Sequence, residues 1–240
     1  MKTIFHTFFY QPMYNILVYL VDILPGGNVG LAVIILTLLV KFVLFPLSQK
    51  SVVTQARMRK LEPEMKRIKE LHKNNQQELA KKTMELYKKE GVNPFSGCFL
   101  ILLQLPIIFA LYYVFLAGLK FDKTLLYSFV SLPVVVNSVF LGIDLVGKSA
   151  LMAFIAGVTQ YFQLHLSMPP LPKRTSNEPM SFQEEFTRNM NTQMKYIFPF
   201  LVFFISYTIS SAIALYWVVS NIFAICQELY VRRKTKELSV

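Results

Sequence analysis

The chain has 240 residues, of which 54% are hydrophobic and 16% are charged, and its formal net charge is +11 at pH 7. Several apolar runs approach the roughly 20 residues that a helix needs to cross a bilayer, which excludes an ordinary soluble domain. Most of the positive charge lies in segments that alternate with these runs, which argues against a nucleic-acid-binding protein. The two cysteines show no disulfide or metal-site pattern.

The N-terminal segment, residues 1–28, is predicted to lie on the outer face of the membrane. Residues 3–24 are rich in Phe, Tyr, Leu and Ile, but His6, Gln11 and Asn15 interrupt the run. A helix lying in the membrane interface fits this pattern better than a full span. The sequence PGGN at 25–28 then ends it.

A first span is predicted at about 29–47, in a helix that continues to about residue 60, and a helical hairpin follows at about 63–90. Apolar residues recur at helical spacing on both arms of the hairpin, and Asn75 with Glu78 resembles a capping box at the start of the second arm. Residues 49–90 hold 12 Lys and Arg against 6 acidic residues, so the hairpin surface is basic.

Four further apolar spans follow the hairpin. Residues 119–147 are expected to form a loop at the outer interface, because Pro133 and Asn137 interrupt their apolar stretches. Residues 168–193 are expected to form a polar, mobile loop. The fold class is therefore an all-α polytopic membrane protein with an interfacial N-terminal helix, a cytoplasmic helical hairpin and five spans, at about 29–47, 96–118, 149–167, 195–209 and 212–230.

The basic residues set the orientation of these spans. Besides the hairpin, four basic residues lie in 167–195 and four in the tail from Arg232, whereas 1–28 and 119–147 hold only Lys2, Lys120 and Lys123. Cytoplasmic loops carry the excess of Lys and Arg, so the hairpin, the 168–193 loop and the C-terminus are predicted inside and the N-terminus outside.

Polar side chains inside the spans are candidate site residues. An ionisable residue at membrane depth is costly and usually faces a polar cavity or a partner, and Lys41 is such a residue. Thr37 and Lys41 share one helix face, as do Gln160 and Gln163, and Trp217 and Asn221. The residues that we expect to line a wet groove are Lys41, Thr37, Gln104, Gln160, Gln163, Trp217 and Asn221.

Each of these residues also has a purely structural interpretation. Lys41 is about six residues from the cytoplasmic end of its span, roughly 9 Å at helical rise, and snorkelling to the headgroups is the alternative. The glutamines are equally consistent with hydrogen bonding between helices, and Trp217 with packing. The basic charge of the hairpin is also explained by topology alone, because cytoplasmic loops are generally rich in Lys and Arg.

No catalytic constellation is present in the sequence, and an enzyme is not expected. The three His residues are scattered, and there is no HExxH motif, phosphate-binding loop or GxGxxG motif. The predicted spans contain no Asp, which argues against intramembrane proteolysis. We expect no cofactor, no metal and no recognition of a specific nucleic-acid sequence.

Several motifs together resemble the YidC/Oxa family of membrane protein insertases. They occur in the family's order over about residues 3–236: GVNPFSGC at 91–98, LQLPI at 103–107, ALY at 110–112, FLGIDL at 140–145, MKYIFP at 194–199 and ALYWVVSN at 214–221. The chain resembles a short bacterial form without a large periplasmic domain.

The resemblance implies an insertase core over 29–240, in the bacterial cytoplasmic (inner) membrane, that inserts and folds nascent membrane proteins alone or with the Sec translocon. It implies a hydrophilic groove open to cytoplasm and lipid and closed outward, with a positive charge on the first span. The family usually has Arg there, and Lys41 matches that position. The partners it implies are nascent membrane proteins, the Sec translocon and the lipid bilayer.

The basic cytoplasmic face predicts weak binding to two anionic partners, ribosomal RNA and lipid headgroups. The residues expected to make these contacts are Lys66, Arg67, Lys69, Lys73, Arg232 and Arg233. The alternative function is a small membrane transporter or channel, which would need a path to the outer side and, ideally, inverted repeats. A purely structural assembly subunit is a third class.

Overall fold

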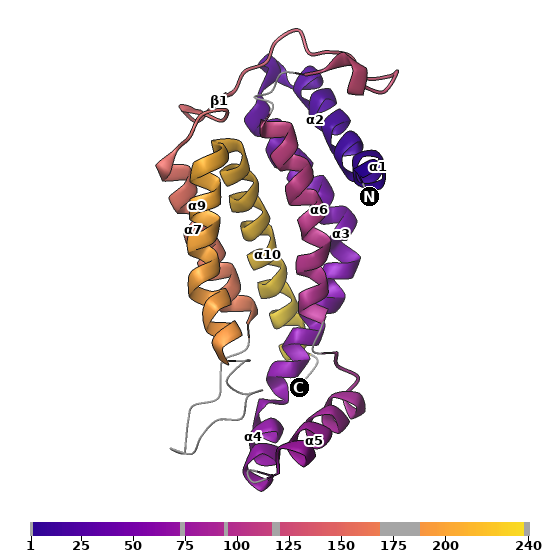
Figure 1. Cartoon of the computed structure of the whole chain (residues 1–240), viewed down its shortest axis with the longest axis vertical. Coiled ribbons are helices and arrows are strands. Elements are labelled where there is room, and N and C mark those ends of the chain that lie inside the picture. The colour runs from indigo at the N-terminus through magenta and orange to yellow at the C-terminus, as the bar shows by residue number, and fades with distance from the viewer. Residues whose placement is uncertain (1, 73–74, 94–95, 117–120, 169–187, 238–240) are drawn as a thin grey trace.

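The computed structural model describes residues 2–72, 75–93, 96–116, 121–168 and 188–237 (Figure 1). Apart from two short strands, its elements are helical, as an all-α membrane protein requires. In chain order the elements are α1 (Lys2–Phe5), η1 (His6–Tyr10), α2 (Gln11–Ile23), η2 (Pro25–Gly27), α3 (Val29–Lys60), α4 (Glu62–Leu71), α5 (Gln76–Lys89), α6 (Ser96–Leu116), η3 (Lys123–Leu125), β1 (Val139–Phe140), β2 (Ile143–Asp144), α7 (Ala150–Ser167), η4 (Gln193–Ile197), α9 (Phe198–Ile209) and α10 (Ser211–Glu237).

The long helices run side by side along the molecule (Figure 1). Helix α10 packs against both α7 and α3, and α7 packs against α9. Small residues permit these close approaches: a Cβ atom added at Gly157 of α7 would lie 3.1 Å from the Pro199 carbonyl oxygen and 3.2 Å from Cβ of Phe203. Helix packing in lipid depends on such small residues, because lipid offers no hydrophobic drive for association.

The exterior of this bundle is apolar. Phe42, Phe154, Phe200 and Phe204 are each more than half exposed. By length and composition, two helices of the described residues suffice to cross a membrane, Val29–Met58 and Ser211–Arg233. Apolar side chains facing outward over the length of a bundle are stable when lipid, rather than water, surrounds them.

Helix α3 confirms the expected continuation of the first span. It runs unbroken for 32 residues through Pro46 to Lys60, a length of roughly 48 Å at 1.5 Å per residue. It therefore reaches from the bundle to the base of the hairpin, where Leu61 forms a small apolar cluster with Leu86 and Val92.

The hairpin helices α4 and α5 lie at one end of the molecule, and α1 and α2 lie at the other (Figure 1). The expected cap of α5 is confirmed, because the side chain of Asn75 accepts a hydrogen bond from the Glu78 amide at 3.1 Å. Residues 73 and 74, between the two arms, lie outside the described residues.

Helix α2 packs against α3 and α6. Leu17 and Val18 are fully buried in the main core, while Tyr19 and Ile23 are about half exposed. The turn after α2 needs glycine at Gly27, where φ is +62° and an added Cβ would lie only 2.0 Å from the Val135 carbonyl oxygen.

The segment 121–149 is an ordered loop rather than a free one. Strands β1 and β2 pair antiparallel, Val139 with Asp144 and Phe140 with Ile143, which the sequence did not predict. Asn137 ties the loop to the start of α3, because its backbone accepts from the Val29 amide at 3.0 Å and donates to Gly27 at 2.9 Å. This loop covers the end of the bundle opposite the hairpin (Figure 1).

One predicted boundary is wrong. Residues 188–192 are helical and continue through η4 into α9, so the 168–193 loop ends earlier than expected; most of that loop, residues 169–187, lies outside the described residues. No Gly or Pro separates 188 from 198, so nothing stops the helix there. Helix α10 continues beyond the fifth predicted span, through the basic tail to Glu237, because Arg, Lys and Glu favour helix.

Candidate functional site

Lys41 is held by a hydrogen-bonded chain that crosses three helices. Its Nζ atom on α3 donates to Oε1 of Gln104 on α6 at 3.4 Å, and the Gln104 amide donates to the hydroxyl of Tyr216 on α10. We call these residues the Lys41 cluster. The sequence brought Lys41 and Gln104 forward separately, and the structure places them in contact.

Tyr216 is a member of this cluster that the sequence analysis missed. Its side chain is almost fully buried, as is that of the neighbouring Trp217. A buried tyrosine hydroxyl normally needs a hydrogen-bond partner. The sequence signal for such a partner was Gln104, a polar residue in another predicted span. Trp217, which was predicted to line the groove, is itself 7% exposed and belongs to the core.

Thr37 shares the α3 face of Lys41, but its hydroxyl is satisfied within its own helix. Its Oγ1 atom donates to the Val33 carbonyl at 2.6 Å, and the side chain is 1% exposed. A hydroxyl that bonds the carbonyl four residues earlier needs no partner from outside the helix. Thr37 therefore adds little polarity to a cavity in this conformation.

The polar residues of α7 form a second group. Gln160 donates to Gln163 at 3.0 Å, and Gln163 donates to the Ser167 hydroxyl at 3.1 Å. Asn221 of α10 donates to the Thr159 hydroxyl at 3.2 Å and so links the two helices. Helix α10 packs against both α3 and α7, and it contributes Tyr216 to the Lys41 cluster and Asn221 to this second group.

An ion pair between the buried Glu228 and the partly exposed Arg232 lies near the hairpin end of α10. Glu228 is 0% exposed, and its carboxylate accepts from Nε of Arg232 at 3.0 Å. The same guanidinium donates to the Leu166 carbonyl near the end of α7. The sequence analysis overlooked Glu228 although it lies within the fifth predicted span, and its i, i+4 spacing to Arg232 was the signal.

A second contact at this level joins α10 to α3. Gln227 donates to the Ser48 hydroxyl at 2.9 Å, and Ser48 also donates to the Phe45 carbonyl at 3.0 Å. Gln227 is buried, so this polar pair lies inside the bundle. Helix α10 is thus connected by polar contacts to α3 and α7 near the hairpin end.

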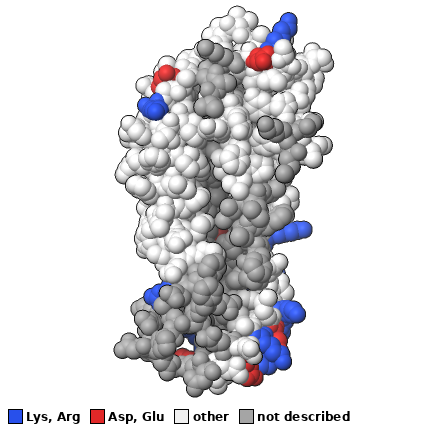
Figure 2. Space-filling view, viewed as in Figure 1, with Lys and Arg blue, Asp and Glu red and all other residues white. Residues whose placement is uncertain are grey.

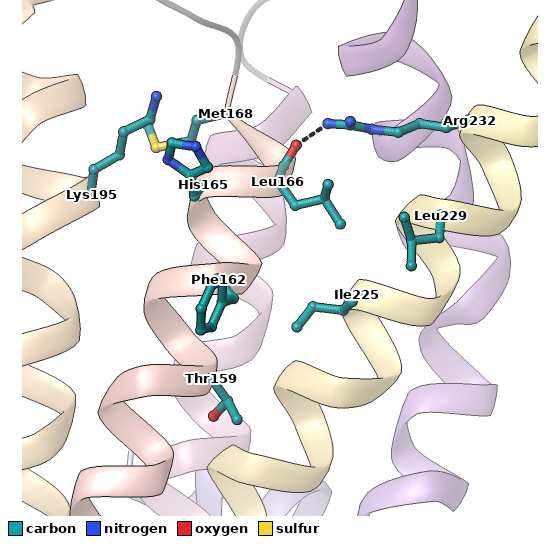
Figure 3. A pocket seen from close by; sticks show the side chains of 9 residues that line it. All are labelled: Thr159, Phe162, His165, Leu166, Met168, Lys195, Ile225, Leu229 and Arg232. Atoms are coloured by element: carbon teal, nitrogen blue, oxygen red, sulfur yellow. Dashed lines mark hydrogen bonds between the residues drawn. The ribbon is translucent and has the colours of Figure 1, made fainter.

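A partly open cavity of about 720 Å³ lies between α7 and α10 (Figure 3). Most of its wall is apolar, and its basic side chains lie at the level where α7 ends. The lining residues are Thr159, Phe162, His165, Leu166, Met168, Lys195, Ile225, Leu229 and Arg232. None of the seven predicted groove residues is among them. The sequence could not reveal this cavity, because the cavity depends on how α7 and α10 diverge.

The predicted basic contact residues lie around the hairpin and the end of α10. Lys66, Arg67 and Arg233 are exposed, while the side chains of Lys69 and Lys73 lie outside the described residues. Figure 2 shows Lys and Arg gathered at the hairpin end of one face, whereas the described surface along the bundle is largely uncharged. On this face the charged side chains therefore lie mostly toward the ends of the bundle, away from its apolar sides.

Charge pairs also occur on the hairpin itself. Lys82 and Glu85 of α5 are 2.9 Å apart, and the hydrogen bond from Lys82 holds the pKa of the Glu85 carboxyl below its usual value. Both groups are in water, so such a pair adds little stability. Among the residues that the structure describes, His, Cys, Asp and Glu do not gather in groups of three or more that could hold a metal ion.

Comparison with known proteins places the sequence of this chain in one family. A family model described as "60Kd inner membrane protein" matches residues 20–238. A protein named "Membrane protein insertase YidC" from Fusobacterium nucleatum is 32% identical over 213 residues, which are 87% of this chain and 88% of that protein.

Two proteins of the same name are longer than this chain. The Wolinella succinogenes protein is 32% identical over 229 residues, 95% of this chain but 38% of its own length. The Ectopseudomonas mendocina protein is 31% identical over 230 residues, again 95% of this chain but 34% of its own length. The chain thus spans little more than a third of these two relatives.

Proposed function

Because the chain belongs to the YidC/Oxa family of inner membrane proteins, we propose that it is a membrane protein insertase and chaperone. Relatives that carry the name insertase support this activity. The observation that carries the proposal is a basic side chain in a hydrogen-bonded chain that crosses three helices, inside a bundle whose exterior is apolar.

The proposed topology has five spans with the N-terminus outside and the C-terminus in the cytoplasm. Helices α3, α6, α7, α9 and α10 supply the spans, residues 1–28 form the outer segment and residues 29–240 the insertase core. The basic hairpin and the basic end of α10 lie at the same end of the molecule, which supports a cytoplasmic location for both (Figure 1).

In the proposed mechanism a lightly hydrophilic client segment enters a groove from the cytoplasm. Lys41 attracts acidic residues of the client, and Gln104, Gln160, Gln163 and Asn221 offer hydrogen bonds that lower the cost of bringing polar groups partway across. Thr37 shares a helix face with Lys41, and Trp217 shares one with Asn221. Opening requires that some of the contacts within the Lys41 cluster exchange for contacts with the client or with water.

Release of the client into lipid needs no cofactor and no catalytic residue. Burying an apolar span in the bilayer is favourable by about 25 cal/mol per Å² of apolar surface removed from water. The membrane potential adds a force that moves acidic residues outward. The loop that covers the outer end of the bundle supports a groove that is closed on that side (Figure 1).

The proposed partners are nascent membrane proteins, the Sec translocon, the surrounding lipid and, weakly, the ribosome. Contacts with the ribosome would come from the exposed cations of the hairpin, with a smaller share from Arg232 and Arg233. Binding to ribosomal RNA through Lys and Arg is electrostatic, so it should weaken as salt rises.

The proposed function is tested by depletion and rescue. In bacterial cells depleted of their own insertase, expression of this chain should restore insertion of a small client, scored by protease accessibility of its outer segment. Failure to restore insertion by a chain that reaches the membrane would favour a transporter, a channel or a structural subunit. A solute flux through the pure protein in vesicles would favour the first two.

A further inference from the structure

The loop opposite the hairpin carries a run of exposed apolar side chains. Residues 124–143 contain no Asp, Glu, Lys or Arg. Val134 is 95% exposed and Phe129 is 76% exposed, and the neighbouring apolar residues that are at least 40% exposed are Leu132, Val135 and Val136. We call residues 129–136 the outer apolar segment. Single apolar side chains are common on protein surfaces, but a contiguous set of this kind marks a surface that contacts a partner or a membrane.

The outer apolar segment is held in place on both sides. Before it, the Tyr127 amide donates to Oδ1 of Asn15 at 2.7 Å, and Nδ2 of Asn15 donates to the Leu125 carbonyl at 3.0 Å. Asn15 is buried in the core side of α2. After the segment, the Asn137 amide donates to the Gly27 carbonyl. The exposed side chains are thus presented on an ordered backbone, and covering them costs little further conformational entropy.

The segment continues the apolar exterior of the bundle. On α2, exposed apolar residues recur at helical spacing, at Ile16, Tyr19 and Ile23, and so form one stripe. The stripe ends one turn before Gly27, the residue against which the Val135 carbonyl packs. Since the chain is a membrane protein, lipid is the apolar phase that surrounds this exterior.

Backbone polarity limits how deep the segment can lie. Residues 131–136 form neither helix nor strand. Irregular backbone that faces lipid does not occur within the hydrocarbon region, because its amides and carbonyls need partners. The boundary between headgroups and acyl chains is compatible, and amphipathic helices bury their apolar side chains there by about 5–10 Å. Beyond Asn137, Val139 pairs with Asp144, whose exposed carboxylate belongs in water, so the segment ends before this pair.

From this geometry we propose that the outer apolar segment enters the outer leaflet, with Phe129, Leu132 and Val134 among the upper acyl chains and its backbone at headgroup level. The partner is the bilayer itself, and because the segment is uncharged it needs no anionic lipid. Through Asn15 and Gly27 the segment would fix the depth of α2 and of the start of α3. The proposal rests on the proposed spans, but not on insertase activity.

The collisions of a spin label test this placement without any client. Cys98 and Cys226 are changed to Ser, Val134→Cys carries the label, and the full chain is reconstituted in vesicles of phosphatidylethanolamine and phosphatidylglycerol. Electron paramagnetic resonance then measures collisions with oxygen, which concentrates in lipid, and with a nickel chelate, which stays in water. Oxygen should dominate at Val134→Cys, as at Phe154→Cys on the exposed side of α7. Nickel should dominate at Lys123→Cys, an exposed position in the same loop.

Charge added to the segment should move it out of the membrane. With the label at Val136→Cys, the double change Leu132→Asp and Val134→Asp should lower the oxygen collisions and raise the nickel collisions. Lys123→Asp changes the charge of the loop by the same two units outside the segment, and it should leave both unchanged. Because the substituted side chains are exposed, these variants should fold, which circular dichroism checks.

Two results would overturn the proposal. Dominant nickel collisions at Val134→Cys in the folded protein would place the segment in water. Few collisions with either reagent would show that protein covers it, and recovery of oxygen collisions when the protein is diluted in lipid would identify that cover as a second copy of this chain. A label in lipid on a chain that fails to insert clients would leave this proposal standing, and a label in water on an active chain would leave the proposed function standing.

Discussion

Lys41 is expected to act through its charge rather than its shape. Lys41→Arg should retain insertion, Lys41→Ala should weaken it for clients with acidic outer segments, and Lys41→Glu should weaken it most. A unit charge at about 4 Å contributes roughly 1 to 4 kcal/mol between water and a partly buried site, so a fivefold or larger loss is expected. The measurement is insertion of such clients in insertase-depleted cells.

The matched control is Lys41→Met, which keeps the apolar stem and removes the charge. It should behave like Lys41→Ala with acidic clients, and both should insert clients without acidic residues normally. Normal insertion of acidic clients by Lys41→Ala would show that the lysine merely snorkels, and that its contact with Gln104 is structural.

The ion pair of Glu228 and Arg232 should contribute to the stability of the bundle. Arg232→Met leaves a fully buried carboxylate without its guanidinium, so the free energy of unfolding should fall by about 1–3 kcal/mol, less than for a wholly buried pair because Arg232 is partly exposed. Thermal unfolding in detergent, followed by circular dichroism, measures the change. Arg233→Met is the control, and equal melting of both variants and the unmodified chain would contradict this role.

At the scale of single residues, the sequence identified the polar side chains inside the predicted spans but not the hydrogen bonds between them. Lys41 and Gln104 stand out because polar residues in apolar runs are rare, and they do contact each other. Their link to Tyr216 depends on the packing of α6 against α10, which helical spacing within one segment does not reveal. Thr37 was predicted from spacing alone, which does not say that its hydroxyl turns to its own backbone.

The hairpin should be the most mobile of the described helical elements. Among the residues that the structure describes, helices α4 and α5 share a small apolar cluster around Leu61, Leu86 and Val92, whereas α10 is packed on two sides. Few apolar contacts mean a low cost of local opening. Hydrogen exchange should therefore be faster in α4 and α5 than in α10, and equal protection of the two regions would contradict this prediction.

Among the elements, the helices were predictable and the short strands were not. Apolar length and the glycines and prolines located the long helices, and the Asn75 cap located the start of α5. Strands β1 and β2 have two residues each and arise from pairing across a tight turn at Leu141 and Gly142, which periodicity cannot detect. The helical residues 188–192 were missed because they are polar, and apolar length was the criterion for a span.

The topology of the whole molecule can be tested by cysteine labelling. In a background without Cys98 and Cys226, the second of which is exposed, single cysteines are introduced and treated with an impermeant thiol reagent. Asn75→Cys in the hairpin should be labelled only after the cells are opened, whereas Leu141→Cys in the outer loop should be labelled in intact cells. Labelling of Asn75→Cys in intact cells would overturn the proposed orientation.

The proposed orientation rests on charge, because cations accumulate in cytoplasmic segments, a rule that needs no knowledge of packing. The cavity between α7 and α10 was not predictable, because its lining comes from residues about 60 positions apart, such as Phe162 and Ile225, and its existence depends on the divergence of two helices. Figure 2 adds what composition cannot show: on this face the charged side chains lie mostly toward the ends of the bundle rather than along its apolar sides.

Reconstitution of the pure protein into liposomes tests the central claim most directly. A small client with an acidic outer segment is synthesised outside the vesicles, and protease protection of that segment is measured with no other protein in the membrane. Protected client should appear with the unmodified chain and fall with Lys41→Glu, while empty liposomes give the background. Protection equal to that background, by a chain shown to be folded and correctly oriented, would contradict the assignment of insertase activity.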